Sequence, residues 1–172
     1  MIMSLIYSSR CLLDHTTSEF EYGIESIRVA ADRNNRVFDI TGFMFFFDNK
    51  FVQIIEGDFD NVTNLYKNIR RDPRHETCRL VEFCEVPFHT FSSASMISSI
   101  EFIRNNSAEL HIKMKFLNKF IGENGQTSIK IRDLLLSIAQ ELQRKPHFPK
   151  FDYNFELENS GYPQRPPGIV LS

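Results

Sequence analysis

The stretch 40–55 reads ITGFMFFFDNKFVQII and decides the fold of this chain. Two apolar runs, 40–47 and 51–55, flank the polar loop Asp48-Asn49-Lys50, which predicts a β-hairpin with a three-residue turn. Both runs are apolar almost without alternation. Because strands of this kind are covered on both faces, we expect helices on each side of the sheet.

Further strands are expected before and after the hairpin. Residues 2–8 form a short apolar run, and residues 79–87 and 90–100 read as two more strands around a proline-containing turn. Together with the helices between them, these strands predict the order βαββαββ within about 100 residues.

Two helices are expected between these strands. The first begins at Ser18, which forms a capping-box pattern with Glu21, and ends near Asn34-Asn35. The second follows Asp58 or Asp60 and stops at Pro73. The apolar positions on their inner faces are Phe20, Ile24, Ile27 and Ala31 in the first helix, and Val62, Leu65, Tyr66 and Ile69 in the second.

This order predicts an α/β fold of the α+β type, a ferredoxin-like sandwich with a five-stranded mixed sheet. Right-handed crossovers place the first two helices on one face. Two later amphipathic stretches, about 107–121 and 127–144, are expected to cover the other face. We expect a core at 1–104, a C-terminal helix pair at 105–145 and a Pro- and aromatic-rich tail at 146–172.

Composition narrows the possible functions of the chain. Its 172 residues suit one domain, and its net charge of -2 gives no general attraction to nucleic acid or anionic lipid. No apolar run approaches the length of a membrane span, and the start lacks a secretory signal. Three cysteines without metal spacing predict reduced thiols in a cytoplasmic protein. Seventeen Phe and no Trp are unusual.

A few polar residues stand out, and each has an ordinary structural interpretation. Gln53 shares a strand face with Phe51 and Ile55, so its amide is expected in apolar surroundings, bonded either to nearby backbone or to a functional partner. Tyr7 on the first strand poses the same question. Asn34-Asn35 can be a helix cap, and the stretch 72–75 can be a helix stop with basic residues near the dipole.

The sequence contains none of the common catalytic motifs that we considered. The five histidines form no HExxH pattern or i, i+4 pair, so no metal site is expected. No GxSxG or phosphate-binding glycine loop is present either. The chain is therefore not expected to be an enzyme.

Taken together, these features resemble the BLUF domains, which are blue-light sensors that use flavin. The resemblance covers about residues 4–100 with its elements in order. Its motifs are Leu5-Ile6-Tyr7-Ser8-Ser9, Asn34-Asn35, Asp39-Ile40-Thr41-Gly42, Phe51-Val52-Gln53-Ile54-Ile55-Glu56-Gly57, Ile69-Arg70-Arg71-Asp72-Pro73-Arg74-His75, Phe91 and Ser95-Met96.

The resemblance implies a flavin cofactor, FAD with FMN or riboflavin as alternatives, held between the first two helices on one face of the sheet. It assigns flavin contacts to Tyr7, Ile27, Asn34, Asn35, Gln53, Asn68, Ile69, Asp72, Arg74 and His75. Relatives often carry a basic residue at position 68 and Arg at position 89, where this chain has Asn68 and His89.

The resemblance also implies a photochemical switch. Light is expected to drive electron and proton transfer from Tyr7, while Gln53 changes its hydrogen bonds by rotation or tautomerism and absorption shifts to the red. Many relatives carry Trp two residues before the conserved Met; here that residue is Ala94. We therefore expect Met96 to point inward near Gln53 in both states and to pass the signal to the C-terminal helices.

Two other classes of protein remain as alternatives. An RNA-recognition motif shares the βαββαβ order, and the run 43–47 imitates its aromatic strand, but that motif needs exposed rings and a basic surround. A flavin-dependent redox enzyme needs a second substrate pocket and a catalytic acid. We expect instead a cytoplasmic signalling protein that acts through a regulatory protein partner, a homo-oligomer or both, without nucleic acid or membrane.

Overall fold

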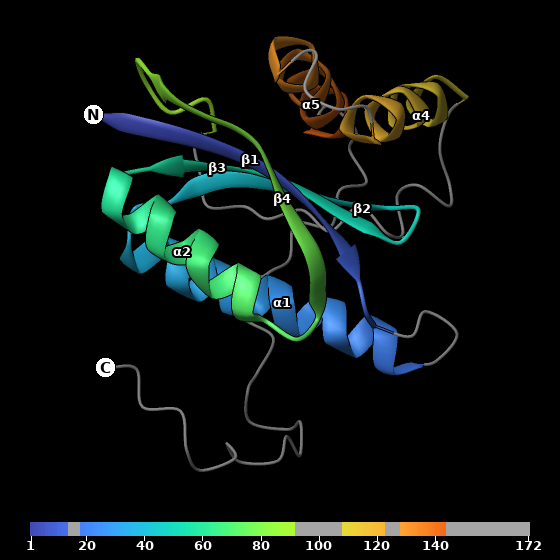
Figure 1. Cartoon of the computed structure of the whole chain (residues 1–172), viewed down its shortest axis with the longest axis horizontal. Helices are drawn as coiled ribbons and strands as arrows, with labels where there is room; N and C mark the ends of the chain where they lie inside the picture. Colours follow the sequence, from blue (N-terminus) through green and yellow to red (C-terminus); the bar gives the residue numbers. More distant parts are fainter. Residues whose placement is uncertain (14–17, 92–107, 123–127, 144–172) are drawn as a thin grey trace.

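A computed structural model describes residues 1–13, 18–91, 108–122 and 128–143 (Figure 1). The strands are β1 (Ile2–Cys11), β2 (Thr41–Phe47), β3 (Lys50–Gly57) and β4 (His75–Val86). The helices are α1 (Ser18–Val37), α2 (Phe59–Arg71), α4 (Ala108–Gly122) and α5 (Ser128–Gln143). Figure 1 shows α1 and α2 on one face of the sheet and α4 and α5 on the other, which confirms the expected layers.

The strands form a four-stranded sheet in the order β2-β3-β1-β4. All three pairings are antiparallel, so the described strands do not form the expected mixed sheet. The hairpin explains this, because β3 turns back from β2 and inserts between β2 and β1, which run in the same direction. Most of the fifth strand predicted at 90–100, including Met96, lies outside the described residues.

The hairpin turn is shorter than the sequence pattern predicted. Phe47 pairs with Lys50, so only Asp48 and Asn49 form the turn. Both have positive φ angles, 49° and 59°. Asp and Asn tolerate this left-handed conformation better than most residues, and two such residues in a row make the tight turn that matches the twist of a hairpin.

Two predicted boundaries also change. The pairing of Cys11 with His75 extends both β1 and β4 through polar residues, so β4 begins four residues earlier than the predicted strand at 79. The first helix begins at Ser18 as predicted but continues to Val37, past Asn35. The second helix begins after Asp58 and has Asp72 as its C-cap, immediately before Pro73, as predicted.

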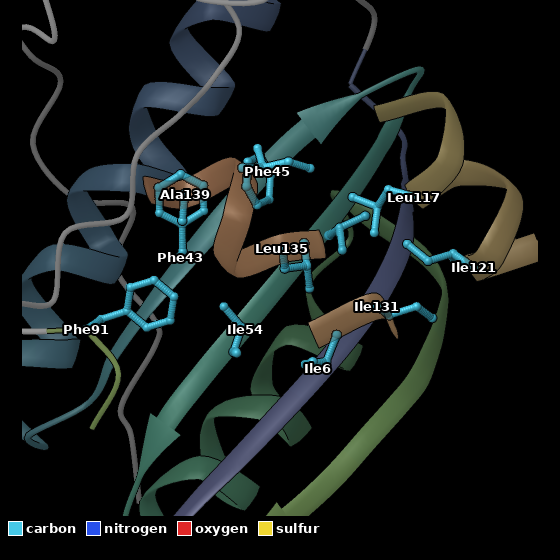
Figure 2. Close-up of a cluster of buried hydrophobic side chains, with 12 residues drawn as sticks. Ile6, Phe43, Phe45, Ile54, Phe91, Leu117, Ile121, Ile131, Leu135 and Ala139 are labelled. Carbon is cyan, nitrogen blue, oxygen red and sulfur yellow. The ribbon is translucent and has the colours of Figure 1, made fainter. Parts of the chain in front are cut away.

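The core between the sheet and the C-terminal helices is one continuous cluster. Figure 2 shows side chains of β1, β2 and β3 meeting those of α4 and α5. Its buried members are Ile6, Phe43, Phe45, Val52, Ile54, Phe91, Leu117, Ile121, Ile131, Leu135, Ile138 and Ala139. Phe43 and Phe45 are buried by this packing, and Phe46 and Phe47 are partly buried, so the aromatic run offers no exposed stacking platform for RNA.

A buried carboxylate holds the chain where it leaves β4. Glu56 in β3 is fully buried, and its Oε2 accepts hydrogen bonds from the backbone N–H groups of Thr90 (2.6 Å) and Phe91 (3.4 Å). Thr41, the register partner of Glu56, lies 2.7 Å from Nδ1 of His89 through its Oγ1. His89, whose role the sequence left open, is therefore part of this anchor.

Candidate functional site

The layer beneath α1 and α2 is divided, unlike the one beneath α4 and α5. The cluster under α1 contains the buried side chains Cys11, Phe20, Ile24, Ile27, Met44 and Phe51. A separate cluster under α2 contains Leu5, Tyr7, Ile40, Ile55 and Val62, with Leu65, Tyr66, Ile69 and Phe83 packed against it. The helix faces predicted from the sequence form these clusters, but the two clusters do not merge.

Gln53 lies at the boundary between the two clusters. Alternate residues of a strand share a face, so Gln53 points to the same side as Phe51, which belongs to one cluster, and Ile55, which belongs to the other. Its side chain is only 3% exposed. A buried primary amide needs hydrogen-bonding partners for its oxygen and both of its N–H groups.

The amide oxygen has its partner on the neighbouring strand. Tyr7 and Gln53 are register partners of β1 and β3, and the Tyr7 hydroxyl donates a 2.6 Å hydrogen bond to Oε1 of Gln53. Tyr7 is 1% exposed. Since the oxygen of the amide accepts this bond, its two N–H groups point away from the Tyr7 hydroxyl.

Burial sets the protonation state of this tyrosine. Desolvation raises the pKa of Tyr7 well above its ordinary value, and the nearby Cys78, Tyr66 and Asp72 raise it further. Tyr7 is therefore a neutral phenol at physiological pH and remains a hydrogen-bond donor to Gln53.

His75 closes the site on a second side. It is the first residue of β4, and its Nδ1 lies 2.8 Å from Oγ of the buried Ser9. Its ring centroid is 4.5 Å from that of Phe51 and 6.5 Å from that of Tyr7. Burial lowers the pKa of His75 to about 4, with Asp72 opposing and Arg74 assisting, so the imidazole is neutral at pH 7.

An ion pair lies at the end of α2. Nε of Arg74 donates a 2.8 Å hydrogen bond to Oδ1 of Asp72, and Nη1 of Arg74 donates a 3.3 Å bond to Oγ of Ser26 in α1. Burial alone raises the pKa of Asp72, but the hydrogen bonds and charge of Arg74 lower it overall. This pair therefore links the end of α2 to α1 with a partly exposed cation and anion.

The remaining residues predicted to contact flavin lie on α1 and α2 and differ in burial. Asn35 lies in the last turn of α1 with its side chain 2% exposed, and its backbone oxygen accepts a 2.8 Å bond from Ile40 N. Asn34 precedes it in the same helix. Ile27 is buried and Ile69 half-buried, in different clusters, whereas Asn68 is exposed on α2.

Two residues of the site were not assigned to it from the sequence. Ser9 follows the apolar part of β1, and only its contact with His75, 66 positions later, reveals its place. Tyr66 was expected as an apolar member of the second helix. Its ring centroid lies 5.5 Å from that of Tyr7, and Arg70 lies 6.0 Å above it.

These groups fit the chemistry of a flavin. Isoalloxazine is a flat ring system with apolar faces and a polar edge that offers both donors and acceptors. The site supplies apolar walls from α1 and α2 in separate clusters, with the amide of Gln53 at their boundary and the neutral ring of His75 beside it. The last turn of α1 adds the buried amide of Asn35. An amide both donates and accepts, so this donor set matches such an edge.

Other kinds of site are not found in the described part of the chain. Within residues 1–13, 18–91, 108–122 and 128–143, no group of three or more His, Cys, Asp or Glu side chains is placed to hold a metal ion. Among the helices that the structure describes, none has the length and apolar character needed to cross a membrane.

Comparison with known proteins points to the same chemistry. A family model named BLUF, described as sensors of blue-light using FAD, matches residues 2–97. The blue light- and temperature-regulated antirepressor BluF of Escherichia coli (strain K12) is 34% identical over 98 residues, which are 56% of this chain and 23% of the relative. The chain therefore spans less than a quarter of the length of that protein.

Solved structures share the fold. A bacterial light-regulated adenylyl cyclase aligns with a TM-score of 0.57 at 27% identity, covering 70% of this chain and 34% of the cyclase. BlrB, a BLUF protein in its dark state, aligns with a TM-score of 0.62 at 22% identity, covering 81% of this chain and 96% of BlrB.

Proposed function

This chain belongs to the BLUF family of blue-light sensors that bind flavin, and on that premise we propose that Tyr7 and Gln53 form its photochemical switch. The observation that carries the proposal is the 2.6 Å hydrogen bond from the Tyr7 hydroxyl to Oε1 of Gln53, buried at the boundary of the two clusters. A phenol held in this way can give up an electron and a proton together.

We assign the cofactor to the boundary between the cluster under α1 and the cluster under α2. We place Ile27 and Ile69 against its faces, and Asn35, Asn34 and Gln53 at its polar edge. Asp72, Arg74, His75 and Asn68 are assigned to the flavin or its side chain. FAD, FMN and riboflavin share the ring that these residues contact, so each of the three fits the proposal.

A bound flavin would supply absorption of blue light and an acceptor for the electron that Tyr7 gives up. A tyrosine that has lost an electron is strongly acidic, and Oε1 of Gln53 lies 2.6 Å from its oxygen, in position to receive the proton. When electron and proton return, the Gln53 amide is left with changed hydrogen bonds, by rotation or by tautomerism. The hydrogen bond that this rearrangement adds is expected to shift absorption to the red.

The output is proposed to be a changed protein surface and not a chemical product. Relatives include an antirepressor and a light-regulated cyclase, and we propose that this chain likewise acts on a protein partner, through α4 and α5, as a homo-oligomer or with a regulatory protein. The three free cysteines favour the cytoplasm. Transmission through Met96, in the Met-in arrangement, stays a prediction.

Absorption spectroscopy tests this proposal directly. Purified protein loaded with FAD should be yellow, and blue light should shift its spectrum reversibly to the red. Tyr7→Phe should keep the colour and lose the shift, because the variant has no hydroxyl proton to pass to Gln53. A protein that takes up no flavin when FAD is supplied in excess refutes flavin binding, and a reversible shift in Tyr7→Phe refutes the role of Tyr7.

A further inference from the structure

The strand β4 is irregular directly beside Tyr7. Ile6 pairs with Glu82 and Tyr7 with Leu80, so Val81 is an extra residue in β4. Val81 packs against the core under α4 and α5, and Glu82 also faces that side, where it contacts α5. A β-bulge of this kind interrupts the ladder locally, and a second irregularity follows between Ser8 and Arg10. The bulge at Val81 is the one directly beside Tyr7, so a shift of β1 against β4 can occur there.

An arginine of α5 joins the two strands at this bulge. Nε of Arg132 donates a 2.6 Å hydrogen bond to Oε1 of Glu82, and Nη2 pairs with the same oxygen. Nη2 also donates to Oγ of Ser4 in β1 at 2.9 Å and lies 3.4 Å from Sγ of Cys84. The side chains of Arg132 and Glu82 are only 16% and 9% exposed, so water compensates little when the pair separates.

A second arginine fixes α4 to the same strand. Nη1 of Arg79 donates a 2.7 Å hydrogen bond to the backbone oxygen of Ile121, in the last turn of α4. Carbonyl groups in the last turn of a helix have no partner within the helix, so this bond satisfies one of them. Arg79 precedes Val81 in β4 and Glu82 follows it. Arg79 is bonded to α4, and Glu82 is bonded to α5.

The bulge therefore lies between the switch and the C-terminal helices. Tyr7 faces α2, while its neighbour Ile6 packs in the core with α4 and α5. A change at the Tyr7–Gln53 bond that moves β1 can shift it against β4 at Val81, and this shift displaces Glu82 relative to β1. Arg132 bonds to Ser4 in β1 and to Glu82 in β4, so a displacement of one strand against the other pulls on this side chain and can be passed to α5.

Building on the proposed function, we infer that Arg132 is a positioning residue that couples the Tyr7–Gln53 switch to α5 through the bulge at Val81. This route uses β4 and is separate from the predicted route through Met96. In this route α5 is the element that responds to light, and the bonds of Arg132 to Glu82 and Ser4 are the contacts that change.

Hydrogen exchange on the FAD-loaded full chain tests this role. In wild-type protein, blue light should change amide exchange in residues 128–143. In Arg132→Gln, exchange there should already be about tenfold faster in the dark, since a largely buried ion pair is broken. The further change on illumination should fall to less than a third of the wild-type change, while the red shift of the flavin is retained.

Arg10→Gln is the matched control, because Arg10 pairs with Glu76 between the same two strands but at an exposed position. It should behave as wild type in both measurements. A light-induced exchange change in Arg132→Gln as large as in wild type overturns the inference. A missing red shift in wild-type protein instead refutes the proposed function, so the two failures are distinguishable on the same samples.

A double variant separates coupling from helix stability. Arg132→Met with Glu82→Leu replaces the ion pair by apolar side chains, which can preserve stability. We expect α5 to be protected in the dark as in wild type and to respond little to light. If this double variant shows the full light-induced exchange change, the ion pair is not the coupling element and the inference is wrong.

Discussion

The hydroxyl of Tyr7 and the amide oxygen of Gln53, 2.6 Å apart, form a buried hydrogen bond between register partners on adjacent strands. The bond joins residues 46 positions apart, on the boundary between two apolar clusters. Each of the two buried groups needs the other as its hydrogen-bond partner, and the proposed proton transfer needs both.

A double-mutant cycle should measure this dependence. Tyr7→Phe and Gln53→Leu each leave the other polar group buried, so each should lower the free energy of unfolding by about 1–3 kcal/mol. The double variant should lose about 0.5–3 kcal/mol less than the sum. Urea denaturation of the flavin-free protein gives the four values, and additive losses would show that the bond contributes no coupling.

Tyr22→Phe provides the control for loss of a hydroxyl, because Tyr22 is an exposed residue of α1. Its effect should stay within about 0.5 kcal/mol of wild type.

Stability should fall with acidification because of His75. Its pKa is about 4 in the folded protein and about 6.5 when unfolded, so the unfolded chain binds more protons between these values. The stabilisation is fully present above pH 6.5 and is lost as the pH falls toward 4. Between pH 7 and pH 5 this group should account for about 2 kcal/mol.

The comparison of wild type with His75→Gln isolates this contribution. The other histidines, Asp72 and Arg74 are common to both proteins, so the wild type should lose about 2 kcal/mol more than the variant between pH 7 and pH 5. Equal losses in the two proteins would contradict a depressed pKa for His75.

Glu56 should stabilise the chain where it leaves β4. Glu56→Leu removes the acceptor for the N–H groups of Thr90 and Phe91 and should cost about 2–3 kcal/mol in denaturant unfolding. Glu56→Gln keeps an acceptor oxygen and should cost less. Glu85→Leu, at an exposed position of β4, should have an effect within about 0.5 kcal/mol. A Glu56→Leu variant as stable as the Glu85 control argues against the anchor.

Gly42 should not tolerate a side chain. Its φ is 157°, and an added Cβ would lie 2.2 Å from the backbone oxygen of Ile54 in the paired strand. Gly42→Ala should therefore destabilise by about 3 kcal/mol or more, since the backbone of β2 or β3 must move. Gly57→Ala, whose Cβ comes no closer than 3.3 Å to any neighbour, should cost less. Thermal unfolding of the two variants compares them, and the reverse ranking would contradict the described register.

Local patterns in the sequence predicted much of this fold. The 3.6-residue period identified the inner faces of α1 and α2, and the unbroken apolar strands indicated that both faces of the sheet are covered. The bulge at Val81 was not predicted, because it depends on the pairing of β1 with a strand about 75 residues later. The Arg132–Glu82 ion pair is equally non-local, at 50 residues.

In the candidate site, too, contacts between residues far apart in the sequence could not be predicted from local patterns. Position in a strand indicated that Gln53 is buried, but its partner Tyr7 was assigned only through the family resemblance. Ser9 and His75 are 66 residues apart, and no local pattern connects a serine near the end of one strand with a histidine at the start of another.

The division of the layer beneath α1 and α2 has a consequence for the protein in the cell. The opposite face of the sheet has a single continuous core, whereas this face has two separate clusters, at whose boundary we propose that the flavin binds. Flavin at 100 times its dissociation constant would add about 2.7 kcal/mol to stability by mass action. Chains made when flavin is scarce should therefore be less stable than loaded chains and should unfold more often.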